Sequence, residues 1–567
     1  MMRYIITTAL FLILPFLCSC TEDDGPDAPG LPPSSPVNTE TGLTVTFTGK
    51  HFRLADGVDF TDAPVISWSD TVWQNDRIYN QLLLTATDSD LNQLALTASP
   101  LESRDGLIPA ENVTIYTVGP VSGDAAPSVD AQPTPRPSAV VYDALLPVLP
   151  SKITGGEKIP VWLTIDIPDG IPTGSYSGEI NISVADKTVA TCNIDLLVTD
   201  KHLPEPSEWE FHLDLWQFPF RITQILNDNG ATIKPLSDKH FEILKPFYSL
   251  LADAGQKTIT TYIKDGAFNR GNTMIGWTLS SSGKWTFDYT DFDRYVEFMD
   301  ELGISRQISC FSLAGWNNVV GYTDEADGNS YKYKSTPIGS QEFNDVYSAF
   351  LTDFRNHLKQ KGWFERAVLF MDENTNDEMR SIVNFIRSMG DDWKIGLSGR
   401  YIDADIEREF YNYATIIGTA PTSTAISVPV FYTSCSQLHP NNYLSPLTSP
   451  AEMTWMAWHA LAKGFKGYQR WAFDNWSRPD IFDARDGANT AGDFHMIYRS
   501  NNDASVTPVS SIRMHMLRDG IQDYEKARII GHQKLRSAIR AFGSSDAPDA
   551  ASSIKAAQSE IKKLSVK

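Results

Sequence analysis

Between residues 43 and 200, apolar and polar positions alternate in short runs that Gly, Pro, Asp and Asn interrupt. Alternation with a period of two is typical of strands that bury one face and expose the other. Turn sequences separate the later runs, as at Pro168–Gly170 and Pro172–Gly174. This pattern predicts an antiparallel β-sandwich over residues 43–200.

After residue 208 the pattern changes, and short apolar runs alternate with longer segments of helical spacing. This repetition predicts a parallel sheet, and its length predicts an elaborated (β/α)8 barrel of the TIM type over residues 208–567 with a short helical C-terminus. We also expect a hairpin inserted at Met274–Tyr289. The strands are expected at Phe211–Trp216, Lys257–Ile263, Gln307–Ser312, Ala367–Glu373, Lys394–Leu397, Ala414–Ile417, Pro429–Thr433 and Gly467–Phe473.

One of these strands ends abruptly on two adjacent carboxylates, Asp372 and Glu373. The residues that follow, Thr375–Glu378, are typical of a helix N-terminus. Barrel enzymes carry their chemistry at the carboxyl ends of strands, which favours a catalytic role for the pair. Acids before a helix also stabilise its positive end without any catalytic purpose. Taken alone, the pair leaves both interpretations open.

Other polar and aromatic residues follow the predicted strands and would meet the two acids at the barrel mouth. Carboxylates surrounded by Trp and Tyr suit a sugar, because the rings stack on its apolar face while the carboxylates contact its polar edge. Aromatic residues more often belong to a core, so this evidence is supportive only. The candidate substrate-binding residues are Asp214, Trp216, Lys264, Tyr432, Trp471 and Trp476.

Composition and motifs exclude several other classes of function. The formal net charge of −22, with no cluster of Lys and Arg, argues against a nucleic-acid partner. The histidines follow no metal-ligand spacing, so we expect no metal. A serine-nucleophile elbow, a P-loop and a dinucleotide fingerprint are also missing from the sequence, so we expect no cofactor.

The N-terminus is similar to a bacterial lipoprotein signal peptide. Arg3 precedes the apolar run Tyr4–Leu17, and Ser19 precedes Cys20. We therefore expect a signal peptide over residues 1–19, a lipid-anchored Cys20 and a flexible tether over residues 20–42. This interpretation places the protein in the cell envelope, anchored to the outer membrane and facing either the surface or the periplasm.

Several motifs together resemble glycoside hydrolase family 123. In the predicted barrel they are Phe211–Gln217, Met371–Glu373, Phe431–Cys435, Gly467–Trp471 with Asn475-Trp476, and Arg518–Glu525; in the sandwich they are Ile159–Trp162 and Pro172–Gly178. The resemblance covers nearly all of the chain after the tether. It implies a β-N-acetylgalactosaminidase with Asp372 and Glu373 as the catalytic pair, acting on a glycan of a glycolipid or glycoprotein.

The adjacency of the two acids favours a substrate-assisted, retaining mechanism, in which the 2-acetamido oxygen of the sugar attacks the anomeric carbon. Glu373 would then be the general acid and base, and Asp372 would hold the acetamide N–H. Analogy with other substrate-assisted enzymes makes Tyr432 a donor to the acetamide carbonyl. Two alternatives stay open: a two-carboxylate glycosidase that pairs Glu373 with Asp214 or Asp474, and a non-catalytic, surface glycan-binding lipoprotein. The preference between N-acetylgalactosamine and N-acetylglucosamine is also open.

Overall fold

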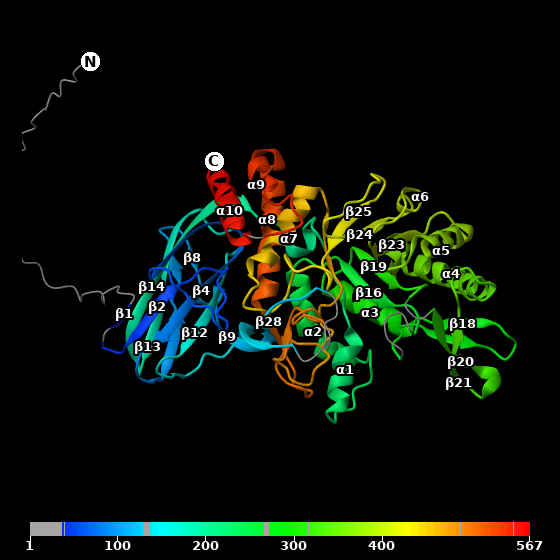
Figure 1. The fold of residues 1–567 in the computed structure, drawn as a ribbon, viewed down its shortest axis with the longest axis horizontal. Coiled ribbons are helices and arrows are strands. Elements are labelled where there is room, and N and C mark those ends of the chain that lie inside the picture. The colour runs from blue at the N-terminus through cyan, green and yellow to red at the C-terminus, as the bar shows by residue number, and fades with distance from the viewer. Residues whose placement is uncertain are drawn as a thin grey trace, which may run out of the picture.

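The computed structural model describes residues 37–38, 40–129, 136–265, 271–315, 318–486, 489–547 and 549–567. The predicted signal peptide, the lipidation site Cys20 and most of the predicted tether lie outside these residues. A sheet-rich N-terminal part and an α/β part lie on either side of a group of C-terminal helices (Figure 1).

The N-terminal part contains two sheets that pack face to face, which confirms the predicted sandwich. Their strands pair antiparallel, except that β3 and β14 of the second sheet run parallel. The strands of the first sheet, in spatial order, are β1 (Val37–Asn38), β2 (Leu43–Phe47), β4 (Arg77–Ala86), β12 (Lys158–Asp166), β9 (Val113–Asp124), β10 (Ser138–Leu146), β28 (Pro508–Ser511) and β27 (Tyr498–Arg499). The strands of the second sheet, in spatial order, are β3 (Ser67–Gln74), β14 (Lys187–His202), β13 (Gly174–Val184), β7 (Leu101–Glu102) and β8 (Leu107–Ile108). Strand β6 (Leu94–Ala98) also pairs with β13. A two-stranded sheet joins β5 (Leu91–Asn92) and β11 (Lys152–Ile153).

Strand β12 is buried on both faces, which explains its mostly apolar sequence. Val161 and Leu163 enter the sandwich core, because alternate side chains of a strand share a face. Trp162, between them, points the other way and packs with the core of the α/β part. One strand therefore contributes to two cores.

The α/β part contains eight parallel strands in the order β15-β26-β25-β24-β23-β22-β19-β16. A single bridge between Leu213 and Gln256 joins the two ends of this order, so the barrel is nearly closed. The predicted barrel is thus confirmed. The strands, in chain order, are β15 (His212–Leu215), β16 (Thr258–Tyr262), β19 (Gln307–Phe311), β22 (Ala367–Asp372), β23 (Lys394–Gly399), β24 (Asn412–Ile416), β25 (Val428–Tyr432) and β26 (Gly467–Arg470).

Helices follow most of these strands, but the segment between β24 and β25 contains none. That segment, residues 417–427, is short and includes Gly418 and Pro421 among several Ser and Thr, residues that favour turns. The helices are α1 (Pro219–Asp228), α2 (Asp238–Asp253), α3 (Thr290–Glu301), α4 (Gln341–Lys361), α5 (Asn376–Met389), α6 (Ala404–Glu407), α7 (Ala451–Lys463), α8 (Ile512–Ile530), α9 (Arg536–Arg540) and α10 (Ala550–Ser565).

An additional four-stranded sheet lies at the far side of the barrel from the sandwich (Figure 1). The predicted hairpin at Met274–Tyr289 is confirmed as two of its strands. The order is β18-β17-β20-β21, with bounds Trp285–Asp288, Gly276–Leu279, Val319–Asp324 and Ser330–Ser335.

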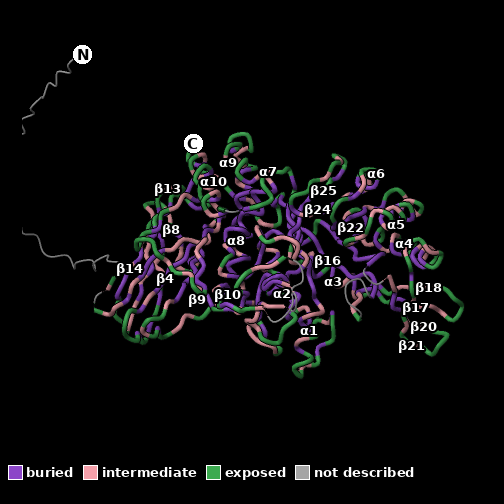
Figure 2. Tube along the Cα trace, in the orientation of Figure 1, coloured by how far each residue is buried: buried purple, intermediate pink, exposed green. Residues whose placement is uncertain are grey.

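Helix α8 connects the sandwich to the barrel. Strand β28, which extends the first sheet of the sandwich, leads directly into α8. The Trp162 indole donates to Nδ1 of His515 (3.0 Å), and Asp143 accepts from Arg53 (3.2 Å) and Arg513 (2.9 Å). These groups are buried, and Figure 2 shows α8 buried along most of its length. The sandwich therefore holds one wall of the barrel in place.

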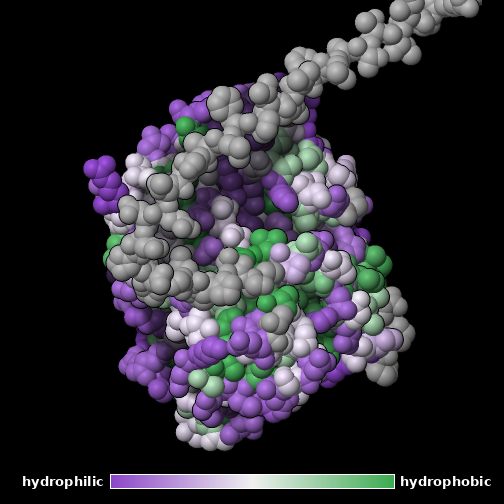
Figure 3. All heavy atoms as spheres, turned by 90° about the vertical axis from the view of Figure 1, so that its left-hand side faces the viewer, coloured by the Kyte–Doolittle hydropathy of each residue, from purple (hydrophilic) through white to green (hydrophobic). Residues whose placement is uncertain are grey.

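The surface of the sandwich end is largely hydrophilic, with groups of hydrophobic side chains between the polar ones (Figure 3). Val148 is the most exposed of the described large hydrophobic residues, at 74%. Within the described ranges, we find no helix that is both long and apolar enough to traverse a bilayer.

Candidate active site

The two predicted catalytic acids lie where β22 ends at the barrel mouth. Asp372 is half-buried and Glu373 is exposed. In a regular strand, consecutive side chains point to opposite faces, so Glu373 would face the outer helices. Instead its φ of 52° lies in the left-handed region, and its N–H donates to the carbonyl oxygen of Ser398 (2.8 Å). This turn ends the strand and leaves both acids at the mouth.

The N-terminus of α5 is capped without help from these acids. Thr375 Oγ1 accepts from the N–H of Glu378 (3.4 Å), and the Glu378 carboxylate accepts from the N–H of Thr375 (2.8 Å). This reciprocal arrangement is a capping box, which satisfies the first free N–H groups of a helix. Asp372 and Glu373 are therefore not needed to cap α5, and what remains of the non-catalytic interpretation is the effect of their charge on the positive end of the helix.

Tyr432, at the end of β25, lies within electrostatic range of both acids. Burial raises the pKa of its phenol, and the charges of Glu373 and Asp372 raise it further. The side chain is 7% exposed and packs with Ala414 and Val430 inside the barrel. Tyr432 is thus a neutral phenol at neutral pH, able to donate its O–H beside the acids.

Three further residues at this mouth were missed in the sequence. Arg400 is exposed, and its positive charge opposes the rise in the pKa of Tyr432. The guanidinium of Arg400 therefore lies near the phenol that also senses the two acids. Tyr401 is 73% exposed, and the buried side-chain oxygen of Asn374 has no hydrogen-bond partner among the described residues. Strand β23 runs to Gly399, two residues beyond its predicted end, so Arg400 and Tyr401 directly follow a strand. Extending that strand would have identified them.

Asp214 and Trp216 lie beneath the mouth, with 0% and 2% of their surfaces exposed. The Trp216 ring packs against Phe311 and Phe370, at centroid distances of 4.7 Å and 6.5 Å. Since β15 and β22 are not neighbours in the sheet, the contact with Phe370 crosses the barrel interior. Phe370 shares a strand face with Asp372, so Trp216 supports the layer below the acids.

Of the remaining predicted substrate-binding residues, Trp471 is half-buried at the mouth, and two are fully packed. Lys264 is 0% exposed and its Nζ donates to the carbonyl oxygen of Val319 (2.9 Å). Trp476 is 3% exposed and its indole donates to the carbonyl oxygen of Ile497 (2.9 Å). Lys264 and Trp476 therefore hold the loops around the mouth, below its surface.

The burial of Asp214 leads to a prediction about stability. Burial raises the pKa of its carboxyl to about 8, and neither carboxyl oxygen has a hydrogen-bond partner among the described residues. Between about pH 4 and pH 8 the folded protein holds this proton and the unfolded chain does not. The free energy of unfolding therefore falls as pH rises across this window. The Asn side chain of Asp214→Asn is neutral at every pH, so the variant should avoid this loss. The difference in free energy of unfolding between variant and wild type should therefore favour the variant by about 2–4 kcal/mol more at pH 8 than at pH 4.5.

Thermal unfolding of the wild type and Asp214→Asn at pH 4.5 and pH 8 tests this prediction. The variant should have the higher Tm at pH 8, and the difference should shrink at pH 4.5. Asp62→Asn, which changes an exposed carboxylate of the sandwich, is the matched control and should change neither value. Equal Tm differences at the two pH values would show that Asp214 is not protonated in the folded protein.

Within the part of the chain that the structure describes, no group of three or more His, Cys, Asp or Glu side chains could hold a metal ion. Asp372, Glu373 and Tyr432, with Arg400 and Asn374 beside them, are the candidate groups for chemistry at the mouth.

Comparison with known families agrees with this arrangement. Residues 216–530 match the model of the glycoside hydrolase 123 catalytic domain, and residues 50–184 match the model of the glycoside hydrolase 123 N-terminal domain. The chain belongs to glycoside hydrolase family 123. It is therefore an enzyme that hydrolyses glycosidic bonds, and the interpretation as a non-catalytic glycan-binding protein is set aside. No curated protein matches the chain.

Among solved structures, a family 123 glycoside hydrolase from Clostridium perfringens, studied for glycolipid glycan hydrolysis, has the same fold. The TM-score is 0.81 at 21% identity, over 92% of this chain and 98% of the other. Two other solved structures are only distantly similar. One is a putative glycoside hydrolase from Bacteroides vulgatus, with a TM-score of 0.23 and 8% identity over 73% of this chain and 67% of the other. The second is a family 5 xyloglucanase from Bacteroides ovatus, with a TM-score of 0.26 and 7% identity over 80% of this chain and 98% of the other.

Proposed function

We propose that this family 123 enzyme releases terminal β-linked N-acetylgalactosamine from glycans, with retention of configuration and with the 2-acetamido group of the substrate as nucleophile. The observation that carries the proposal is the position of Asp372 and Glu373 on one strand end. In a two-carboxylate retaining enzyme, the acid and the nucleophile flank the scissile bond about 5 Å apart, on opposite sides. Consecutive residues approach from one side, which suits an enzyme whose nucleophile comes from the substrate.

In this proposal Glu373 donates a proton to the leaving oxygen as the bond from that oxygen to the anomeric carbon breaks. The acetamide oxygen forms the new bond to the anomeric carbon, which gives an oxazolinium ion. Asp372 accepts a hydrogen bond from the acetamide N–H and stabilises its positive charge, and Tyr432 donates to the acetamide oxygen. Water then attacks the anomeric carbon and gives its proton to Glu373, so the β configuration is restored.

The contacts of the other carboxylates weigh against a two-carboxylate mechanism. Asp214 is buried below the mouth, and both oxygens of Asp474 are occupied. Asp474 accepts from the N–H of Phe218 (2.8 Å) and from the hydroxyl of Tyr248 (3.1 Å), and burial raises its pKa to about 7. Neither group is placed to attack a sugar held by Glu373.

Glycolipid glycans are included in the proposed substrates, since the Clostridium perfringens enzyme of the same fold was studied for their hydrolysis.

The experiment is an assay of the mature chain on nitrophenyl β-glycosides of N-acetylgalactosamine, N-acetylglucosamine, galactose and glucose. The N-acetylgalactosaminide should be hydrolysed fastest. Sugars without an acetamide should be slower by several orders of magnitude, because an intramolecular nucleophile contributes about 7–11 kcal/mol. A thiazoline analogue of the oxazoline intermediate should inhibit the enzyme far more tightly than N-acetylgalactosamine does. Hydrolysis of the galactoside with no hydrolysis of either 2-acetamido sugar would overturn the proposal.

A further inference from the structure

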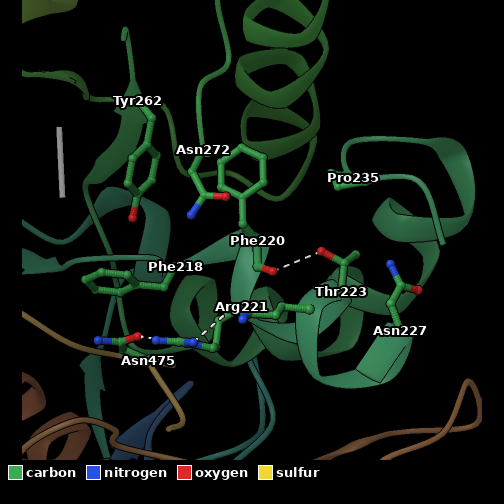
Figure 4. Close-up of a pocket in the computed structure, with 10 residues that line it drawn as sticks. Phe218, Phe220, Arg221, Thr223, Asn227, Pro235, Tyr262, Asn272 and Asn475 are labelled. Atoms are coloured by element: carbon green, nitrogen blue, oxygen red, sulfur yellow. Dashed lines mark hydrogen bonds between the residues drawn. The ribbon is translucent and has the colours of Figure 1, made fainter. Parts of the chain in front are cut away.

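A cavity of about 430 Å³ opens beside the barrel mouth, where β15 leads into α1. Among the described residues, its lining contains aromatic rings, carboxamides and one charged residue, Arg221. Figure 4 shows the side chains of Tyr262 and Asn272 pointing toward Phe218 and Arg221. The described lining residues are Phe218, Phe220, Arg221, Thr223, Gln224, Asn227, Pro235, Tyr262, Asn272 and Asn475.

Arg221 is held in place by neutral groups. Its Nε donates to Oδ1 of Asn475 (3.1 Å) and its Nη1 donates to Oε1 of Gln224 (2.9 Å). Among the described residues, no carboxylate oxygen lies within ion-pair distance of it, and the chain as a whole carries a net charge of −22. A guanidinium has five N–H donors, so Arg221 keeps donors available for a ligand.

Two carboxamides of the cavity also have unused hydrogen-bonding groups. Asn475 is 6% exposed, and its Nδ2 donates to none of the residues that the structure describes, while its Oδ1 orients Arg221. The Asn272 side chain makes no hydrogen bond within the described ranges. Their amide N–H groups are therefore available to donate to a ligand or to water.

The two acids whose pKa values Arg221 affects, Asp474 and Asp486, neutralise its positive charge only in part. Burial raises the pKa of Asp474 to about 7, and both of its oxygens already accept hydrogen bonds from Phe218 and Tyr248. Burial also raises the pKa of Asp486, although Arg478 and Arg221 oppose this shift. The cavity therefore presents a positive group in a protein that is acidic overall.

The cavity is connected to the active site through Trp471. The Phe218 ring, which lines the cavity, packs edge-on against the Trp471 ring at a centroid distance of 6.0 Å. Trp471 directly follows β26, and in the barrel order β26 lies opposite β22, which carries Asp372 and Glu373. A glycan that crosses the mouth from these acids reaches Trp471 and then the cavity.

We propose that this cavity binds a carboxylated sugar on the leaving-group side of the substrate, so that the enzyme prefers acidic glycans to neutral glycans of the same length. The position of the scissile bond in this inference rests on the proposed function. The planar guanidinium of Arg221 matches a carboxylate in a two-bond geometry. Asn272 and Asn475 provide donors for hydroxyl or N-acetyl oxygens, and Phe220 and Tyr262 provide apolar surface for the sugar ring.

The test compares three oligosaccharides that carry the same terminal β-N-acetylgalactosamine on a lactose core. One is neutral, one carries a sialic acid on the core galactose, and one carries a hexuronic acid at the same position. The wild type should show a kcat/KM at least about tenfold higher for one or both acidic substrates, the size expected of one charge-assisted hydrogen bond. The two acidic arms identify which sugar fits.

Arg221→Gln should abolish this preference, because the amide keeps polarity but has no charge, and Arg221→Lys should keep part of it. Both variants should hydrolyse the nitrophenyl N-acetylgalactosaminide at the wild-type rate, since this substrate is too short to reach the cavity. Arg104→Gln, the same change at a 93% exposed side chain of the sandwich, is the matched control and should keep the preference.

Direct binding separates this inference from the proposed function. Titration calorimetry with sialyllactose or the matching uronic acid trisaccharide, which lack the terminal N-acetylgalactosamine, should show Arg221-dependent binding whether or not the enzyme hydrolyses that sugar. If the nitrophenyl substrate is cleaved but the wild type treats acidic and neutral glycans alike, or Arg221→Gln keeps the preference, the inference is overturned. If acidic glycans bind through Arg221 but no N-acetylgalactosaminide is cleaved, the proposed function fails and the binding site stands.

Discussion

Glu373→Gln is expected to abolish hydrolysis of β-N-acetylgalactosaminides with sugar leaving groups, while a dinitrophenyl leaving group keeps much of its rate. The reason is that a general acid contributes about 10²–10⁴-fold only where the leaving oxygen needs a proton. The amide of Gln has the shape of the carboxyl group but no proton to transfer. Measurement of kcat/KM over a series of aryl leaving groups should give a steep dependence on leaving-group pKa for the variant and a shallow one for the wild type.

Glu378→Gln is the matched control for this experiment. Glu378 lies five positions further along and accepts the N–H of Thr375 at the start of α5. Its replacement weakens a helix cap, at a cost of about 1 kcal/mol in stability, and should leave the leaving-group dependence unchanged. If Glu373→Gln slows all leaving groups by the same factor, Glu373 is not the general acid.

The barrel was predictable because its strands are buried on both faces. A strand such as Ala367–Asp372 is almost entirely apolar, and five of its six residues are buried, so it stands out from the helices around it. The helix that follows was predictable from local chemistry, since Thr375 and Glu378 form the capping box within four residues. Both features depend on residues that are close together in the sequence.

The depth of each strand-end residue was not predictable in this way. Lys264 and Arg400 both follow strands and both carry a charge, yet Lys264 is fully buried and Arg400 is exposed. The difference comes from residues far away in the sequence, such as Val319, whose carbonyl oxygen accepts from Lys264. Asp214 is buried for the same reason, because Phe311 and Phe370 close the barrel interior around Trp216.

The cavity at α1 is a second feature that only the folded chain reveals. Arg221 and Asn475, which make the hydrogen bond that orients the guanidinium, are 254 positions apart. The connection of the two domains also depends on residues that are far apart in the sequence, since β28 joins the sandwich sheet although it follows the whole barrel along the chain. Such pairings have no local pattern in the sequence, and they position both the mouth and its neighbouring cavity.

Asp372→Asn is expected to slow good and poor leaving groups together, in contrast to Glu373→Gln. An asparagine still contacts the acetamide, but it cannot stabilise the positive charge that develops on the acetamide as the oxazolinium ion forms. Loss of one such electrostatic contact costs on the order of 10²–10³ in kcat. Asp377→Asn, an exposed acid in the first turn of α5, is the matched control and should keep wild-type kinetics.

Azide distinguishes this division of roles from a mechanism with an enzymic nucleophile. If Asp372 attacked the anomeric carbon, Asp372→Asn would leave an open face, and azide would fill it to give a glycosyl azide of inverted configuration. With the acetamide as nucleophile, that face is occupied by the substrate, so azide should not restore turnover of Asp372→Asn. Recovery of activity with an inverted azide product, or near-wild-type turnover of Asp372→Asn without azide, would assign the nucleophile to the enzyme. Under the proposed mechanism, the half-buried Asp372 faces the acetamide held inside the mouth, and the exposed Glu373 faces the leaving group and the incoming water.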